Sequence, residues 1–231
     1  MEIVLDWVEA FAIGAWVVLE IFFVGLLLTV AIGLLGASAK LSNSRVLRWI
    51  PGVYTTVFRG TPEVLVLLIV YFGSALSLTA FVQLFDPEIK FVDIPPFWAG
   101  SIALGLIVGA YATETFRGAF QGVDRGQIEA GRALGLSSWQ IFRYVRLPQM
   151  WRLALPTFGN HMLSLMKDTA LVSIIGLEEI MYTAKIGTSV TREPFVMYAM
   201  VGVVYLLFTN VISLLVARLE RHAGRYAATR A

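Results

Sequence analysis

The residues of this chain that could do chemistry are a few charged and polar side chains set in or beside long apolar stretches. They are Glu63, Glu114, Arg117, Asn160, His161, Lys167 and Asp168. Glu114 and Arg117 are three positions apart, a spacing that puts both side chains on one face of a helix. Charged groups are costly inside a membrane, so they usually pair with one another or face a cavity. The pattern predicts ion pairs and recognition of a polar ligand.

Motifs for enzymatic chemistry do not occur in the sequence. There is no cysteine, which excludes disulfides, thiol redox chemistry and cysteine metal sites. The two histidines, His161 and His222, are far apart, and neither a zinc-protease HExxH motif nor a GxSxG nucleophile elbow appears. No GxxxxGK[ST] segment supplies a nucleotide site. An intramembrane enzyme and an uncoupled channel are remote alternatives, and we expect no metal or cofactor in this chain.

Composition indicates a membrane protein. Of the 231 residues, 58% are apolar and only 15% are charged, and the mean hydropathy is +0.75. A helix that crosses the bilayer core needs about 20 mostly apolar residues. Five runs meet this length: 21–39, 64–85, 94–113, 153–177 (interrupted by Lys167 and Asp168) and 195–217. We expect one all-α integral membrane domain, 1–231, with five spanning helices, the first starting near Ile13.

Basic residues are distributed unevenly between these runs. Fourteen of the 18 Lys and Arg lie in the first loop, the third loop and the C-terminal tail, whereas the N-terminal segment carries only acids. Basic residues stay on the cytoplasmic side during membrane insertion. The sequence therefore predicts an N-terminus outside and a C-terminus inside. The acidic N-terminal segment also lacks the basic region of a cleavable signal peptide.

The stretch 129–148, EAGRALGLSSWQIFRYVRLP, is a basic, amphipathic insert between two apolar runs. Good helix formers over 127–134 predict one short helix, which Gly135 would end. Ser137 or Ser138 can cap a second helix, which we expect to run until Pro148. An apolar ridge would then stand on a basic background, formed by Leu134, Leu136, Trp139 and Phe142. Such a ridge fits a helix lying among lipid headgroups, or a knob that docks on a partner protein.

The insert resembles the cytoplasmic coupling loop, or EAA loop, of permeases from bacterial ABC importers. That pattern is an EAA triplet, three residues, a Gly, nine residues, an aliphatic residue, one residue and Leu-Pro. The chain follows the spacing at Glu129, Ala130, Gly131, Gly135, Val145, Leu147 and Pro148. Gly131 stands for the third small residue of the triplet, and Val145 for the usual Ile. The resemblance favours docking on a partner protein over a headgroup helix.

Three further stretches look like permease subunits of polar amino-acid ABC importers. They are RGTPEVLVLLIVYFG (59–73), GAYATETFRGAFQGV (109–123) and LPTFGNHMLSLMKDTALVSIIGLEE (155–179). Within that family the chain is most similar to the Q-type permeases for arginine, histidine and opines. The narrower likeness is carried by the acid after RGTP and by the YATETFRGAF and KDTALVS blocks.

The resemblance implies an ABC type I importer permease fold in the bacterial cytoplasmic (inner) membrane. The chain would not be an enzyme, and would move basic L-amino acids such as arginine, histidine, lysine or ornithine inward by alternating access. Another polar amino acid or an opine is the alternative substrate. The implied partners are a dimer of ATP-binding subunits, which would hold ATP and Mg, an extracytoplasmic substrate-binding protein and a second permease. A sister permease is favoured over a second copy, and no nucleic acid is expected.

The resemblance also suggests roles for individual residues. The loop at about 118–152 would couple to the ATPase through Glu129, Ala130, Gly131, Arg132, Ala133, Leu134, Gly135, Leu136 and Phe142. ATP-driven closure of the ATPases would push on 131–136, tilt the third and fourth membrane helices and open a midplane site. Substrate contacts are expected at Glu63, Asn160, His161 and Ser164. Gating or structural roles are expected at Arg59, Glu114, Arg117, Lys167 and Asp168.

Plainer interpretations remain open for several of these side chains. Glu63 follows Pro62 and could be an ordinary acid at a helix N-terminus, where the helix dipole favours it. His161 stands where some cationic amino-acid permeases have Glu, and a helical His is often simply hydrogen-bonded within a bundle. Lys167 and Asp168 point about 100° apart on a helix, so they could form separate interhelical ion pairs. The alternatives are a gate, or an ammonium group that binds a carboxylate at the subunit interface.

Overall fold

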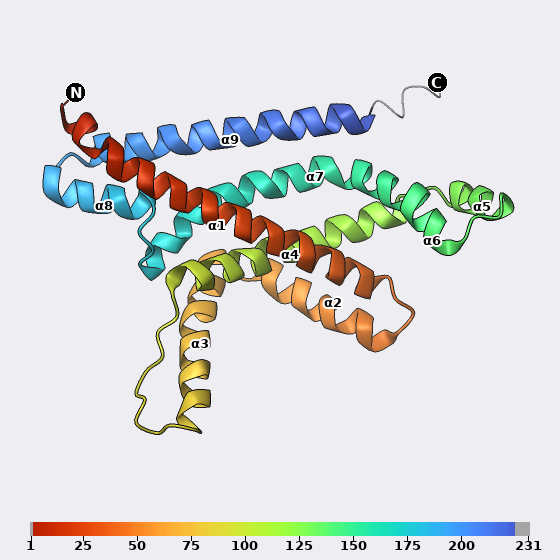
Figure 1. Cartoon of the computed structure of the whole chain (residues 1–231), viewed down its shortest axis with the longest axis horizontal. Coiled ribbons are helices and arrows are strands. Elements are labelled where there is room, and N and C mark those ends of the chain that lie inside the picture. Colours follow the sequence, from red (N-terminus) through yellow and green to blue (C-terminus); the bar gives the residue numbers. More distant parts are fainter. Residues whose placement is uncertain (1, 225–231) are drawn as a thin grey trace.

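A computed structural model describes residues 2–224, and every regular element in this range is a helix. The long helices α1 (Glu2–Lys40), α4 (Pro96–Gln121), α7 (Leu147–Asp168) and α9 (Pro194–Gly224) run roughly along the molecule (Figure 1). Helix α3 (Glu63–Gln83) instead crosses this direction and projects away from the others. The all-α class is confirmed.

Helix α4 lies at the centre of the bundle and packs on α1, α3 and α7. Phe116, Leu104 and Ile107 on α4 are fully buried. Small residues allow the helices to approach closely: a Cβ at Gly105 would lie 2.6 Å from Cβ of Leu28 on α1. Such small-residue contacts are typical of helices packed in membranes. The polar groups of α4 are therefore held in a fixed position relative to α1.

Four helices of the described range are long and apolar enough to cross a membrane, namely α1 (from Leu5), α3, α4 and α9. The fourth predicted run is helical, but by the same measure α7 is not a span. Its sequence includes Asn160, His161 and the pair Lys167–Asp168. At Asp168 the α-helix ends, and a 3₁₀-helix follows over Thr169–Ile175 until Gly176 adopts a left-handed φ of 87°.

Two expected loops contain helices, α2 (Arg45–Gly60) and α8 (Ile180–Thr191). Each of these helices has an N-cap side chain that accepts hydrogen bonds from backbone N–H groups of the first turn. The N-cap is Ser44 in α2 and Glu179 in α8. The expected start of α1 near Ile13 is wrong, because α1 is helical from Glu2. Acidic residues near a helix N-terminus are favoured by its dipole, which suits this longer helix.

The predicted insert forms α5 (Arg125–Ala133) and α6 (Ser138–Ile141), but the second helix does not end at Pro148. A π-helical turn, Phe142–Arg146, joins α6 directly to α7. Proline lacks an N–H and its ring clashes with the carbonyl four residues earlier, and a wider π turn relieves this clash. The expectation that Pro148 ends the helix is therefore wrong.

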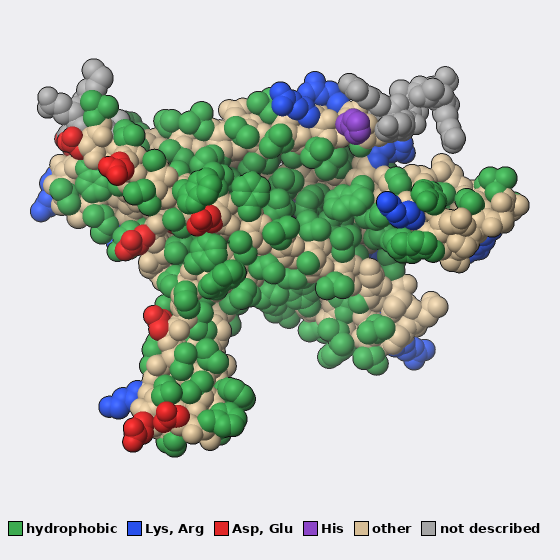
Figure 2. Space-filling model, viewed as in Figure 1, with side chains coloured by type: hydrophobic (Ala, Val, Ile, Leu, Met, Phe, Trp, Pro, Cys, Tyr) green, Lys and Arg blue, Asp and Glu red, His purple; other side chains and the backbone are tan. Residues whose placement is uncertain are grey.

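The two ends of the bundle differ in charge. Helices α5 and α6 and the C-terminal end of α9 lie at one end, and the start of α1 lies at the other. On the visible face, Lys and Arg gather mainly near the former, whereas Asp and Glu gather near the start of α1 and on projecting α3 and its following loop (Figure 2). We call the end with α5, α6 and the end of α9 the basic end.

Candidate functional site

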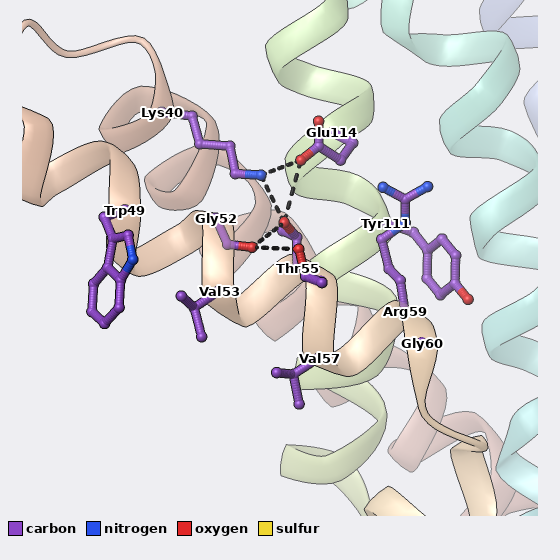
Figure 3. A pocket seen from close by; sticks show the side chains of 11 residues that line it. Lys40, Trp49, Gly52, Val53, Thr55, Val57, Arg59, Gly60, Tyr111 and Glu114 are labelled. Carbon is purple, nitrogen blue, oxygen red and sulfur yellow. Dashed lines mark hydrogen bonds and ion pairs between the residues drawn. The ribbon is translucent and has the colours of Figure 1, made fainter.

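An ion network, formed by Lys40, Thr55, Glu114 and Arg117, joins three helices near the basic end. Lys40 Nζ donates hydrogen bonds to Thr55 Oγ1, at 2.6 Å, and to Glu114. Arg117 Nη2 lies 2.8 Å from the other oxygen of Glu114. The side chains of Lys40 and Glu114 are 14% and 21% exposed. One half-buried carboxylate thus holds two cations. Figure 3 shows the part of this network in which Lys40, Thr55 and Glu114 tie the end of α1 to α2 and α4.

The structure pairs Glu114 with Arg117 on one helix face, as the spacing predicts. Sequence reasoning missed Lys40 as their partner, because this residue looks like an ordinary loop cation after an apolar run. It is instead the last residue of α1. No local pattern could have joined it to Glu114, which is 74 positions away along the chain.

A recess of about 750 Å³ lies beside the ion network, between α2 and α4. Arg59 and Tyr111 line it, and the guanidinium carbon of Arg59 is 5.3 Å from the centre of the Tyr111 ring. On α7, the His161 ring lies 5.9 Å from the same Tyr111 ring, and its Nε2 is 2.9 Å from Thr115 Oγ1. Predicted residues Arg59 and His161 are therefore brought together through α4.

Exposed polar side chains follow one side of α7. Thr157, Asn160, Ser164 and Lys167 recur every three or four positions and are all exposed. A membrane bundle does not favour such a stripe against lipid, so it suits a water-filled path or another protein. We call this stripe, together with Arg59, Tyr111, Thr115 and His161, the polar face.

A pair of carboxyl groups, Glu63 and Asp168, lies next to the polar face. Glu63 is the first residue of α3 and Asp168 the last of α7, and their carboxyl groups are close enough to interact. Both residues are half-buried, and neighbouring Lys167, which is exposed, is also close enough to Asp168 to interact with it. Two adjacent carboxyl groups repel when both are ionised, and a cation placed beside them relieves that repulsion. The arrangement can therefore bind an ammonium or guanidinium group.

Residues 124–142 form a compact structure that we call the coupling turn. The side chain of Asp124 accepts from Gly126 N at 2.6 Å and caps α5. Ser137 and Gln140 form a reciprocal capping box at the start of α6. Between the two helices, Gly135 has a φ of 77°, a left-handed conformation that favours glycine. The predicted stop at Gly135 and cap at Ser137 are confirmed.

The predicted apolar ridge is only partly available for docking. Leu134 is 81% exposed and Trp139 is 68% exposed. Phe142 is half-buried and stacks between Trp139 and Phe120, with ring centres 5.7 and 6.3 Å away. It therefore serves more to anchor the turn on α4 than to reach outward.

Gly131 of the coupling turn is buried, unlike the other residues of its helix that we expected to dock. A Cβ there would lie 3.2 Å from Cγ1 of Ile141, so glycine lets α5 pack on α6. The remaining predicted coupling residues are exposed, or half-buried in the case of Leu136: Glu129, Ala130, Arg132, Ala133, Leu134, Gly135 and Leu136.

Residues 29–225 match the model of a protein family described as the binding-protein-dependent transport system inner membrane component. The chain belongs to this family. As an inner-membrane permease of an ABC importer, it is a transport subunit and not an enzyme, and such permeases work with a separate ATP-binding subunit and a substrate-binding protein.

The sequence similarity to known relatives extends over nearly the whole permease. It is 42% identical over 208 residues, 90% of each chain, to HisQ, the histidine/lysine/arginine/ornithine transport system permease protein of Escherichia coli (strain K12). It is 40% identical over 193 residues to the octopine transport system permease protein OccQ of Rhizobium radiobacter, covering 84% of this chain and 81% of the relative. These matches show a Q-type permease of polar amino-acid importers.

A solved structure confirms the fold. The crystal structure of an amino acid ABC transporter with histidines superposes with a TM-score of 0.79 and 32% identity, over 94% of the permease and 96% of that chain. The described residues contain no group of three or more His, Asp or Glu placed to hold a metal ion.

The site residues of the permease fall into four groups along the bundle. The coupling turn lies at the basic end, and the ion network joins helices near it. The carboxyl pair lies at the opposite end of α7, where α3 begins. Predicted residues Asn160 and Ser164 lie between them on the polar face.

Proposed function

We propose that this permease carries basic L-amino acids across the membrane, and that the carboxyl pair Glu63–Asp168 recognises their cationic side chains. The pair supports the proposal because it places two acids beside a polar stripe in an otherwise apolar bundle. The relatives named for histidine, lysine, arginine, ornithine and octopine transport agree with a cationic ligand. Asp168, which we expected to serve as a gate or a structural ion pair, becomes a substrate residue in this proposal.

We further propose five membrane crossings, with α7 and its 3₁₀ extension as the fourth in chain order. The hydropathy of α7 is low because one of its sides carries the polar face, and a helix that lines a path need not be apolar all round. Its 22 residues are long enough to cross the bilayer core. Five crossings put the basic end in the cytoplasm and the start of α1 outside, in agreement with the charge distribution.

The polar face completes the proposed path. Asn160, His161 and Ser164 would contact the polar groups of the amino acid as it leaves the carboxyl pair. Arg59 would limit passage of cations, since its guanidinium lies against Tyr111 at the recess. Because the polar face is exposed along α7, a second permease is needed to close the path, and we favour a sister chain over a second copy.

The coupling turn would transmit ATP-driven movement. Leu134 and Trp139 supply exposed apolar side chains that can insert into a groove of an ATPase dimer holding ATP and Mg. A push on residues 131–136 would pass through α6 and the π turn into α7. This movement would open the path toward the outside, where the substrate-binding protein delivers its ligand.

Uptake by the assembled importer tests the substrate assignment. Proteoliposomes with the ATPase, the partner permease and the binding protein are given labelled arginine, with lysine, glutamine or octopine as competitor. Glu63→Gln and Asp168→Asn should each lower arginine uptake about tenfold or more, because each removes a carboxylate from the cation site. Glu88→Gln in the exposed loop after α3 removes the same charge as a control.

The outcome separates the proposal from its alternatives. Unchanged arginine uptake in both carboxyl variants would exclude the pair from the site. Labelled arginine uptake that octopine suppresses far more strongly than lysine does would favour an opine as the substrate. Uptake that continues without the ATPase would indicate an uncoupled channel.

A further inference from the structure

A second groove lies away from the recess and the polar face, between α1, α7 and α9. It has a volume of about 380 Å³. Its walls are apolar side chains, among them Leu26 and Val30 of α1 and Leu155 and Met162 of α7. Toward its outer end α7 and α9 touch closely, since a Cβ at Gly159 would lie 2.5 Å from Cγ1 of Val216. None of the proposed transport residues lines this groove.

At the basic end, the lining of the groove includes two basic side chains. They are Arg152 of α7 and His222 near the end of α9. Arg218 and Arg221 lie on the same last turns of α9 and are exposed, with Glu220 as the acid between them. Figure 2 shows Lys and Arg side chains gathered beside a histidine at the upper edge of the basic end. Among the described residues, the ion pairs are Lys40–Glu114 and Arg117–Glu114, so none of these arginines has a carboxylate partner.

Trp151 also lines the groove, next to Arg152. The centre of its ring lies 5.4 Å from the centre of the Phe116 ring, and this packing holds the indole at the inner end of the bundle. Tryptophan prefers the boundary between acyl chains and headgroups. Toward the basic end, the groove thus carries apolar side chains, then an aromatic residue and basic side chains. A phospholipid presents its acyl chain, its glycerol region and its phosphate in the same order.

We infer that this groove binds one phospholipid with an anionic headgroup, drawn from the leaflet at the basic end. The acyl chain lies along Leu26, Val30 and Leu155, and the headgroup phosphate meets Arg152 and the end of α9. Basic pockets between membrane helices favour anionic lipids in this way. A bound lipid would fill the space between α7 and α9 and so hold the inner half of α7 in place.

Lipid retention by the intact importer tests this inference. The complex of permeases and ATPase is titrated with phosphatidylglycerol or phosphatidylcholine in detergent, and bound lipid is counted by native mass spectrometry. Phosphatidylglycerol should bind at least tenfold more tightly. Arg152→Gln should raise its Kd about fivefold, since one basic residue near the headgroup contributes about this factor, and should leave phosphatidylcholine unchanged.

Two other variants keep the test decisive. Arg143→Gln removes the same charge from an exposed position outside the groove and should leave both Kd values unchanged. Leu155→Trp fills the groove without changing charge and should lower phosphatidylglycerol retention. Equal affinity for the two lipids would overturn the inference. So would an equal loss in the Arg152 and Arg143 variants, because the attraction would then be general to the basic end.

Discussion

In the coupling turn each helix cap is made by residues two or three positions apart, whereas the ion network joins Lys40 to Glu114 across two helices. The turn therefore has a shape that its own sequence determines, with exposed side chains free to meet a partner. The network and the polar face exist only after α1, α2, α4 and α7 have packed. A substitution in the turn should thus impair coupling with little loss of stability. A substitution in the ion network should lower stability with less direct effect on coupling.

The largest effect is expected from Glu114→Ala. It leaves Lys40 and Arg117 half-buried without their carboxylate, and breaking such a pair costs about 3 kcal/mol. The thermal unfolding midpoint of the purified permease complex should fall markedly. The double variant Lys40→Met with Glu114→Leu should lose less, because it removes both charges. Equal losses in the single and double variants would mean that the network does not act as a unit.

Gly135→Val should have the next largest effect and should act mainly on coupling. A side chain in the left-handed conformation costs about 2 kcal/mol, although the space around Gly135 is open. Substrate-stimulated ATP hydrolysis and uptake in the assembled importer should both fall, while the membrane bundle stays folded. Gly202→Ala, also in open space but within α9, is the control. If hydrolysis and uptake both survive in Gly135→Val, the turn does not couple.

Leu134→Ala tests the docking surface without changing the backbone conformation of the coupling turn. Because this side chain is 81% exposed, its loss should not change the unfolding midpoint. The affinity of the permease for the ATP-binding subunit should drop about tenfold, as expected for an apolar anchor. Leu84→Ala, at a leucine 77% exposed after α3, should leave this affinity unchanged. Equal affinities in the two variants would place the docking surface elsewhere.

The smallest effect concerns a local cap that is buried, Glu179 at the start of α8. Burial raises the pKa of its carboxyl to about 7 from an ordinary 4.5, against the opposing effect of its two N–H donors. The folded protein therefore keeps a proton that the unfolded chain releases, and stability falls as pH rises from 4.5 through 7. Glu179→Gln should remove this loss, so the unfolding midpoint of the variant should no longer fall between about pH 5 and about pH 8. A pH profile unchanged by the variant would contradict the assignment.

Local chemistry was the part of the structure that the sequence predicted well. The sequence correctly predicted the helix stop at Gly135, the cap at Ser137 and the pairing of Glu114 with Arg117. Each of these depends only on neighbours within one or two helical turns. Helix α2 was missed because its basic residues suggested a loop, although Ser44 was a readable N-cap. The contacts of Lys40 with Glu114 and of Asp168 with Glu63 depend on packing between distant segments, which no spacing along the chain reveals.

The π turn at Phe142–Arg146 has a consequence for how the two regions are aligned. A π turn accommodates one residue more than an α-helical turn, and one residue corresponds to a rotation of about 100° around a helix axis. The π turn therefore sets the direction in which α6 faces, relative to the polar stripe on α7, by rotation about the helix axis. Removal of a single residue from this turn would leave the residues of the coupling turn and of the polar face unchanged. It would rotate one relative to the other by about 100°.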